Sequence, residues 1–258
     1  MNQFVTYKSA ERIGYITIDR ANKRNAINAQ VVRELNWAFE YAENDDSCKV
    51  IILQSTGDVF SAGADLEYIQ QLQSFSLEEN IEDSRNLMTL FKKIYGLKKV
   101  VIAMIQGHAI AGGCGLASIC DFSIASDEAS FGYSEVKIGF IPAIVSVFLI
   151  RKIGEGKTKE LLLSGKNINA KQAVEYGLIN TAITKDKLQN SVMMLAQDLC
   201  QNTSDNSLSA TKRLINNIQN MTLNQALDLA VQENALARNS EDCKKGISAF
   251  LNKEKLHW

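Results

Sequence analysis

The chain has 258 residues, of which 46% are hydrophobic and 22% charged, so it is long enough for one large core or two small domains. A net charge of −1 without a basic stripe argues against a nucleic-acid partner. No segment reaches the roughly 18 apolar residues of a membrane span, and five irregularly spaced cysteines predict no metal site. We therefore expect a cytoplasmic protein in a reducing compartment.

Strands and helices are expected to alternate in the first half of the chain. Short apolar runs predict strands at 4–7, 14–18, 50–54, 100–105 and 122–125. Apolar residues at helical spacing predict helices over 29–43 and 77–95, and residues 67–74 are a helix end or a mobile loop. Beyond residue 143 the strand signal nearly disappears, and helices are expected at about 144–152, 156–163, 170–176, 186–200, 204–217, 222–238 and 241–251.

Two of these strands are each followed by small residues and the start of a helix. Gly112 and Gly113 open a short helix at 113–119, where the first N–H groups have no partner inside the helix. Gly63 and Ala64 precede Asp65, which is a typical helix N-cap residue. One N–H from each turn could converge on a carbonyl oxygen as an oxyanion hole. The alternative is a pair of packing turns, whose glycines only let backbone segments touch.

Three segments, Phe60–Leu66, Gly107–Ala117 and Phe131–Pro142, resemble the enoyl-CoA hydratase/isomerase (crotonase) superfamily in order and spacing. The resemblance covers nearly the whole chain. It implies an α/β fold with a ββα spiral core, assigned to residues 1–195, and a C-terminal helical trimerisation region at 196–258. It also implies an acyl-CoA substrate, with coenzyme A as part of that substrate and no separate cofactor, and a homotrimer or a hexamer built as a dimer of trimers.

The resemblance also assigns residues to the site. The oxyanion donors fall on the N–H groups of Ala64 and Gly112, and one of the two glutamates usual in the family's hydratases falls on Glu135. The other falls on Gly115, which carries no acid. Implied contacts to CoA are Lys23, Asn25, Ala26, Ala62, Asp65, Leu66, Phe250 and Lys253, the last two often reaching a neighbouring subunit. Implied acyl-pocket residues are His108, Tyr133, Ser134, Ile141, Pro142 and Ala143.

Several of these residues have simpler interpretations. By residue type alone, Glu135 is more often a cap or an ion-pair partner, and Pro142 the start of a helix. Lys23 fits a solvated turn, and His108 a loop. An acid that replaces the one missing at Gly115 could come from Glu78, Glu79 or Asp83, although these residues also fit the acidic first turns of a helix.

The segment 134–146 narrows the predicted activity. It lacks the glycine run that follows Pro142 in many hydratases, and it is similar to a branch of methylglutaconyl-CoA hydratases, some of which also have glycine in place of Gly115. The resemblance implies a hydratase that adds water to an α,β-unsaturated acyl-CoA, with 3-methylglutaconyl-CoA as one candidate. A Δ3-Δ2-enoyl-CoA isomerase needs only one carboxylate and is the alternative. A hypothesis of another class is a non-catalytic acyl-CoA-binding scaffold.

Overall fold

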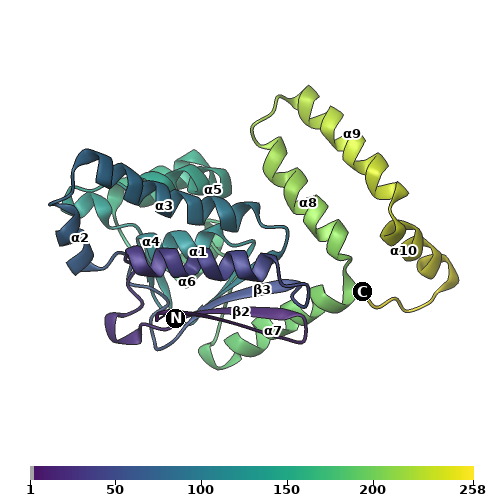
Figure 1. Cartoon of the computed structure of the whole chain (residues 1–258), viewed down its shortest axis with the longest axis horizontal. Coiled ribbons are helices and arrows are strands. Elements are labelled where there is room, and N and C mark those ends of the chain that lie inside the picture. Colours follow the sequence, from purple (N-terminus) through teal and green to yellow (C-terminus); the bar gives the residue numbers. More distant parts are fainter. Residues whose placement is uncertain (1–2) are drawn as a thin grey trace.

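Two sheets organise the chain, which the computed structural model describes over residues 3–258 (Figure 1). The six-stranded sheet has the order β1-β2-β3-β4-β6-β9, with β1 antiparallel to β2 and all other neighbours parallel. A smaller sheet has the order β5-β7-β8. The strands are β1 Val5–Ala10, β2 Ile13–Ile18, β3 Val50–Ser55, β4 Val100–Ile105, β5 Ala109–Ile110, β6 Phe122–Ser126, β7 Ser130–Gly132, β8 Ile168–Asn169 and β9 Thr181–Ile183.

The central strands are apolar on both faces because helices cover both. Ile51 and Leu53 of β3 face the larger core beneath α1 (Ala29–Glu43) and α3 (Leu77–Gly96). Val50 and Ile52, with the opposite parity, face the core beneath α7 (Lys185–Asn202). Figure 1 shows α1 and α7 on opposite sides of the sheet. Successive side chains alternate across a strand, so a strand buried on both faces is a continuous apolar run.

The predicted long elements are confirmed. The strand at 100–105 and the helix at 29–43 have the expected bounds. The helices expected at 144–152 and 156–163 are parts of α5, interrupted at Gly154, whose φ of 74° is not helical. The strands β5, β7, β8 and β9 were not predicted, because two or three residues are too few to show a period. The remaining elements are η1 Ala21–Lys23, α2 Leu66–Leu72, α4 Gly112–Ile119, η2 Glu135–Ile138, α5 Ala143–Ser164, α6 Ala170–Glu175, α8 Asp205–Ile218, α9 Leu223–Asn239 and α10 Glu241–Asn252.

The helical region that extends away from the sheet begins further along the chain than the boundary predicted after residue 195. That position lies inside α7, and the helix continues to Asn202 because Leu199 and Cys200 still pack on the sheet. The chain changes direction at Thr203, which is extended. From there α8, α9 and α10 extend to one side (Figure 1).

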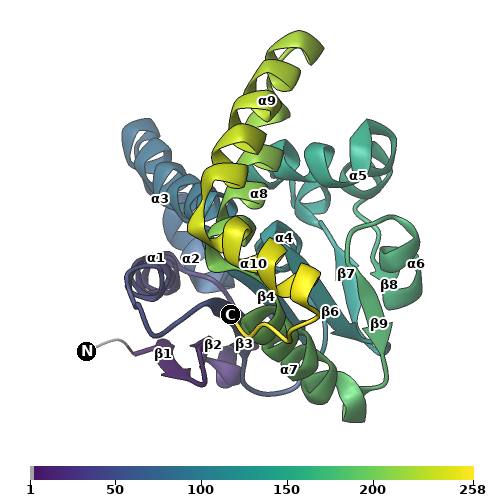
Figure 2. The ribbon, with the colours of Figure 1, turned by 90° about the vertical axis from the view of Figure 1, so that its right-hand side faces the viewer.

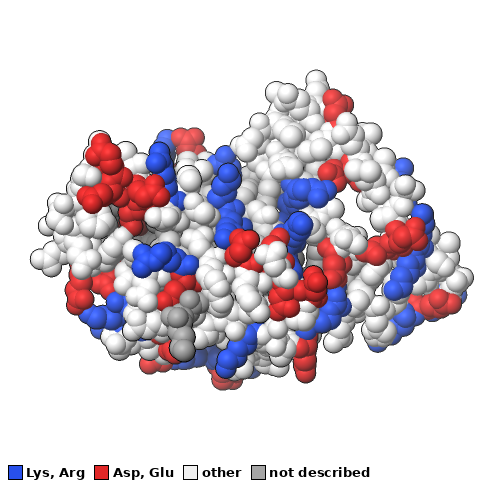
Figure 3. All heavy atoms as spheres, in the orientation of Figure 1, with Lys and Arg blue, Asp and Glu red and all other residues white. Residues whose placement is uncertain are grey.

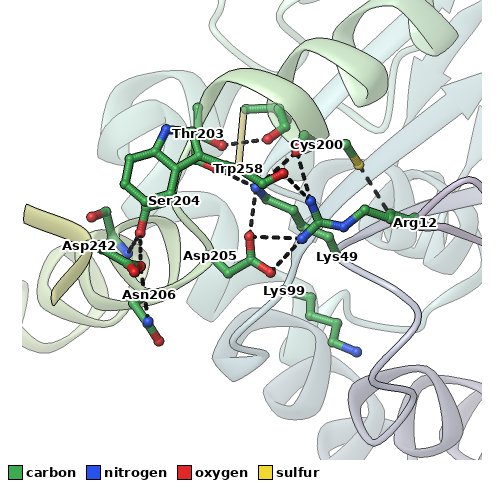
Figure 4. A network of polar contacts seen from close by, with 12 residues as sticks. Arg12, Lys49, Lys99, Cys200, Thr203, Ser204, Asp205, Asn206, Asp242 and Trp258 are labelled. Atoms are coloured by element: carbon green, nitrogen blue, oxygen red, sulfur yellow. Dashed lines mark hydrogen bonds and ion pairs between the residues drawn. The ribbon is translucent and has the colours of Figure 1, made fainter. Parts of the chain in front are cut away.

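Ion pairs join the start of this helical region to the core (Figure 4). Asp205, at the first position of α8, lies 2.9 Å from Arg12 and 2.6 Å from the buried ammonium of Lys49. Arg12 also donates to the main-chain oxygen of Trp258. Further along α8, Lys212 lies 2.6 Å from Asp121 and donates to the main-chain oxygen of Lys99. These contacts place α8 against the core.

Charges of both signs are interspersed over the face shown in Figure 3, and their totals nearly balance, at 28 Lys and Arg against 29 Asp and Glu. Within the described residues, no helix is long and apolar enough to cross a membrane. The same residues contain no group of three or more His, Cys, Asp or Glu side chains placed to hold a metal ion.

We expect Lys212→Met to lower the free energy of unfolding by about 3 kcal/mol, because it leaves the carboxylate of Asp121 without its cation at a largely buried site. Urea denaturation at one fixed protein concentration measures the change. Lys244→Met removes an exposed pair with Glu241 and is the control, for which we expect almost no change. Equal losses in the two variants would contradict the anchoring role of Lys212.

Candidate active site

Two turns at the ends of β3 and β4 are joined by backbone hydrogen bonds. Ser61 N–H donates to His108 O at 3.2 Å, and Ile110 N–H donates to Ser61 O at 3.0 Å. Glycine makes the approach possible, since a Cβ on Gly113 would lie 2.5 Å from Ser61 Cβ. A Cβ on Gly63 would lie 2.8 Å from the main-chain oxygen of Ile110. The segments that hold the two predicted oxyanion donors are therefore neighbours.

The first donor is the N–H group of Ala64. The flanking Gly63 O and Asp65 N–H both bond Ile27, at 2.7 and 2.8 Å. Backbone groups of successive residues in an extended segment point to opposite sides, so the Ala64 N–H points away from Ile27. It has no acceptor among residues 3–258, and Ala64 is exposed.

The second donor is the N–H group of Gly112, the first residue of α4. Ala111 precedes it with φ 49° and ψ −125°, a conformation that costs a residue with a Cβ about 1–3 kcal/mol. The N–H of Ala111 donates to Gly132 O at 2.7 Å, which holds the strained residue in place. Within the described chain the Gly112 N–H has no acceptor, and it lies at the positive end of the helix.

Glu135 begins η2, three residues after the last residue of β7. Its Oε2 is buried and has no hydrogen-bond partner within the described residues. Burial raises the pKa of this carboxyl above its ordinary value. Gly132, three residues before Glu135, accepts a hydrogen bond from the N–H of Ala111 at 2.7 Å, so Glu135 follows a strand that is bonded to the start of α4. A desolvated carboxyl without a partner is suited to general acid–base work.

No acid can be placed at Gly115 without moving its neighbours. A Cβ there would lie 2.5 Å from Val145 Cγ1 and 2.9 Å from Phe91 Cζ. Both side chains are almost completely buried. Figure 2 shows α4 between α3, which carries Phe91, and α5, which carries Val145. Apolar packing therefore occupies the space next to the missing acid.

The three acids considered as replacements have other contacts or lie in the open. Glu79 accepts from the N–H of Ser76 in the capping box of α3, and Glu78 is exposed in the same turn. Asp83 accepts a hydrogen bond from the hydroxyl of Tyr68. These interactions agree with the simpler interpretation of an acidic helix start.

The predicted CoA contacts of the first half of the chain lie around the start of α2. Lys23 is exposed and pairs with Glu67, Ala62 N–H donates to Arg24 O, and Leu66 is 80% exposed. Ala26 is buried next to Ile27, whose main chain bonds both Gly63 and Asp65. The structure thus brings these segments together.

Two side chains in this group are engaged inside the protein instead. Asn25 is fully buried, and its amide donates to Thr56 O and Val59 O at 2.7 and 2.8 Å. Asp65 caps α2 as predicted and forms a buried ion pair of 2.6 Å with Arg20. The side chains of these two residues are therefore already engaged within the protein, and their implied contacts with CoA stay a prediction for their main chains.

Phe250 and Lys253 lie at the end of α10, at the other end of the molecule from α2 (Figure 1). Phe250 is 83% exposed and Lys253 is exposed. Within one chain they are not brought to the turns that carry Ala64 and Gly112. Their predicted contact with CoA therefore requires a second subunit.

The predicted acyl-pocket residues divide into two sets. Ser134, Pro142 and Ala143 flank η2 near Glu135, and Ile141 is 65% exposed beside them. Tyr133 is fully buried, with its hydroxyl 3.3 Å from Ser118 Oγ, so it belongs to the core that packs beneath the site. His108 is exposed, and its Nδ1 lies 2.9 Å from Ser130 Oγ, a contact that fastens the loop to β7 and gives no support to a pocket role.

Sequence reasoning missed Phe91 and Val145 as neighbours of Gly115. A signal for Val145 was present, since it stands within the segment that lacks the usual glycine run after Pro142. Phe91 had no such signal, because it is one of several apolar residues on the buried face of α3. Only the packing of α3 against α4 selects it.

A separate cavity of about 880 Å³ lies elsewhere and is lined by residues that include Tyr7, Trp37 and Tyr41. Two of its carboxylates are already paired: Asp45 accepts from Tyr7 at 2.6 Å, and Glu40 lies 2.7 Å from Lys93. It contains none of the residues assigned to the site.

Comparisons with known proteins agree with this geometry. The enoyl-CoA hydratase/isomerase family matches residues 8–258. A relative from Thermus thermophilus is 36% identical over 93% of this chain and 95% of its own length. The 2,3-dehydroadipyl-CoA hydratase of Escherichia coli is 31% identical over 94% and 93% of the two chains.

Solved structures extend the agreement to the fold. The enoyl-CoA hydratase from Shewanella pealeana superposes with a TM-score of 0.94 at 27% identity, covering 100% of this chain and 96% of that one. The match to the crotonase fold includes both the mixed sheet and the C-terminal helices. By its sequence, its fold and its two glycine-rich turns, the chain belongs to the enoyl-CoA hydratase/isomerase family.

Proposed function

We propose that this protein is an enoyl-CoA hydratase that adds water across the α,β double bond of an acyl-CoA thioester. The observation that carries the proposal is the buried, unpartnered carboxylate oxygen of Glu135 near two turns with free N–H groups. Relatives named as hydratases over nearly the whole chain support it. A scaffold would gain nothing from a desolvated carboxyl, which destabilises the fold.

In this mechanism the N–H groups of Ala64 and Gly112 donate to the thioester oxygen. Glu135 takes a proton from a water whose oxygen attacks the β carbon, and the π electrons move onto the thioester oxygen as an enolate. Glu135 then returns a proton to the α carbon, and the carbonyl re-forms. Each oxyanion donor stabilises the enolate by about 3 kcal/mol, because it is oriented before the charge develops.

The absence of an acid at Gly115 favours a second candidate, the Δ3-Δ2-enoyl-CoA isomerase. Moving a proton between C2 and C4 needs one carboxylate and no water. The apolar side chains of Phe91 and Val145 next to Gly115 offer no group to hold a water there. The same oxyanion donors and the same glutamate serve either reaction.

For the acyl group we propose 3-methylglutaconyl-CoA as the first substrate to test. Residues 134–146 are similar to hydratases of that substrate. The Escherichia coli relative acts, by its name, on another dicarboxylic acyl group. A distal carboxylate on the substrate could help to orient the attacking water, which the protein does not hold at Gly115.

We also propose that the protein assembles as a homotrimer, which can pair into a hexamer. Large apolar side chains lie exposed on α9 and α10, and Figure 3 shows few charges over the tip of the α8–α9 hairpin. An association of this kind buries them and brings Phe250 and Lys253 to a neighbouring site. The exposed apolar residues include Leu223, Leu227, Val231, Leu236, Ile247 and Phe250.

We expect Glu135→Gln to lower kcat at least about a hundredfold, because the amide cannot accept or return the proton. Turnover is measured by mass, with crotonyl-CoA, 3-methylglutaconyl-CoA and a 3-enoyl-CoA offered separately. Glu128→Gln changes an exposed glutamate before β7 and is the matched control, expected to have wild-type activity.

The same assay separates the candidate functions. A gain of one water on either 2-enoyl substrate identifies a hydratase, and conversion of the 3-enoyl-CoA without a change in mass identifies an isomerase. A Glu135→Gln variant with the wild-type rate would contradict the catalytic assignment. Binding without any solvent deuterium exchange at C2 would indicate a scaffold.

We expect Glu135→Gln to be more stable than the wild type near neutral pH. Burial raises the folded-state pKa of Glu135, so the unfolded chain loses this proton first as the pH rises. Wild-type stability therefore falls as the pH rises from about 4.3 through the raised pKa, and the amide avoids this loss. Urea denaturation at a series of pH values measures the difference, which should vanish below about pH 4. A variant that is less stable at every pH would contradict the unpartnered state of the carboxyl.

We expect Gly115→Glu alone to destabilise the fold by about 1–3 kcal/mol, since its side chain must displace Val145 and Phe91. Val145→Gly in the same chain removes the closer contact and should recover part of the loss relative to the sum of the two single variants. Thermal unfolding of the double variant and both single variants measures this coupling. Simple additivity of the two changes would exclude the steric conflict.

A further inference from the structure

The helix α4 has a sequence that does not favour a helix by itself. Three of its eight residues are glycine, and each costs about 1 kcal/mol relative to alanine. Seven of the eight residues are nevertheless buried, and no side chain caps the N-terminus. The position of Gly112, its first residue, therefore depends on contacts made by the rest of the helix.

These contacts are concentrated at the opposite end of α4. The last carbonyl groups of a helix have no partner inside it and need other donors. Here side chains donate to four successive carbonyls near this end, those of Gly115 to Ser118. Gly115 O accepts from Ser118 Oγ (3.1 Å), Leu116 O from Cys120 Sγ (3.3 Å), Ala117 O from Ser123 Oγ (2.6 Å) and Ser118 O from Lys152 Nζ (2.6 Å).

Lys152 is the charged member of this set. It projects from α5, and its Nζ donates to Cys120 O at 3.3 Å as well as to Ser118 O. Among residues 3–258 no carboxylate lies within ion-pair distance of it, and the nearby Asp121 pairs with Lys212 instead. Burial lowers the pKa of Lys152, while Asp121, Cys120 and Cys114 act in the opposite direction. The carbonyls at the negative end of α4 are thus its main polar partners.

We propose that Lys152 is a positioning residue for the oxyanion-binding turn: by holding the C-terminal carbonyls of α4, it sets the axial position of the helix and the direction of the Gly112 N–H. The proposal rests on the function proposed above. The eight residues of α4 span about 12 Å, so Lys152 at one end of the helix would affect transition-state stabilisation at Gly112 at the other end. A unit charge at that distance changes the stability of an oxyanion by about tenfold at an effective dielectric constant of about 20.

The test uses [1-13C]butyryl-CoA, a saturated thioester that cannot be hydrated, and the full-length protein. Difference infrared spectroscopy measures the carbonyl stretching frequency of the bound thioester, and kcat and KM are measured with the substrate identified above. We expect the wild type to lower the frequency. Lys152→Met should lose most of this shift and lower kcat about tenfold, with little change in KM. Lys152→Arg keeps the positive charge and should retain both the infrared shift and the wild-type kcat.

Lys157→Met is the matched control, because it removes a lysine from the same helix, α5, without removing a contact to α4. It should keep the infrared shift and the wild-type kcat. If Lys152→Met does not fold, Lys152→Gln replaces it, because the amide donates to one carbonyl but is neutral. A neutral variant that keeps the shift and the wild-type kcat would overturn the proposal.

The wild-type spectrum separates this proposal from the one on which it rests. If the wild type binds butyryl-CoA without shifting its carbonyl frequency, the oxyanion assignment fails and the role of Lys152 fails with it. If the wild type shifts the frequency and the neutral Lys152 variants do so equally, only the role of Lys152 fails.

Discussion

The close backbone contact between the turns after β3 and β4 is the constraint on which the site depends. Hydrogen bonds between Ser61 and its partners hold the two segments side by side, and a Cβ on Gly63 or Gly113 would prevent this approach. Both turns follow adjacent parallel strands, so the rigidity of the sheet is transferred to them. A separation set by backbone geometry does not depend on side-chain rotamers, which suits two N–H groups that must meet one oxygen.

Unfavourable local features gather around this contact. Ala111 has a backbone conformation that L-residues rarely adopt, α4 is rich in glycine, and the carboxylate of Glu135 is buried without a partner. None of these would persist alone. The surrounding core offsets them, through the two apolar layers on the sheet and the side chains that bind the C-terminal carbonyls of α4. Unfavourable local features that are concentrated in one place, within an otherwise well-packed core, are typical of a functional site.

Local patterns in the sequence predicted the long elements well. The buried strands β3 and β4 are continuous apolar runs, and α1 has a clear helical period, so their positions follow from the residues alone. The N-cap at Asp65 is equally local, since its side chain accepts from the N–H of Glu67, two residues further on. The short strands β5, β7, β8 and β9 were missed because their pairing partners, rather than their own residues, make them strands.

The sequence by itself determined the family, the two glycine-rich turns, the presence of Glu135 and the lack of an acid at Gly115, because each depends on residue identity and spacing. Tertiary structure decided what surrounds them. Phe91 and Val145 fill the space beside Gly115, the side chains of Asn25 and Asp65 are enclosed, and Lys152 reaches α4 from another helix. These contacts join residues far apart in the chain, and burial of that kind is set by the packing of whole elements, which no local pattern encodes.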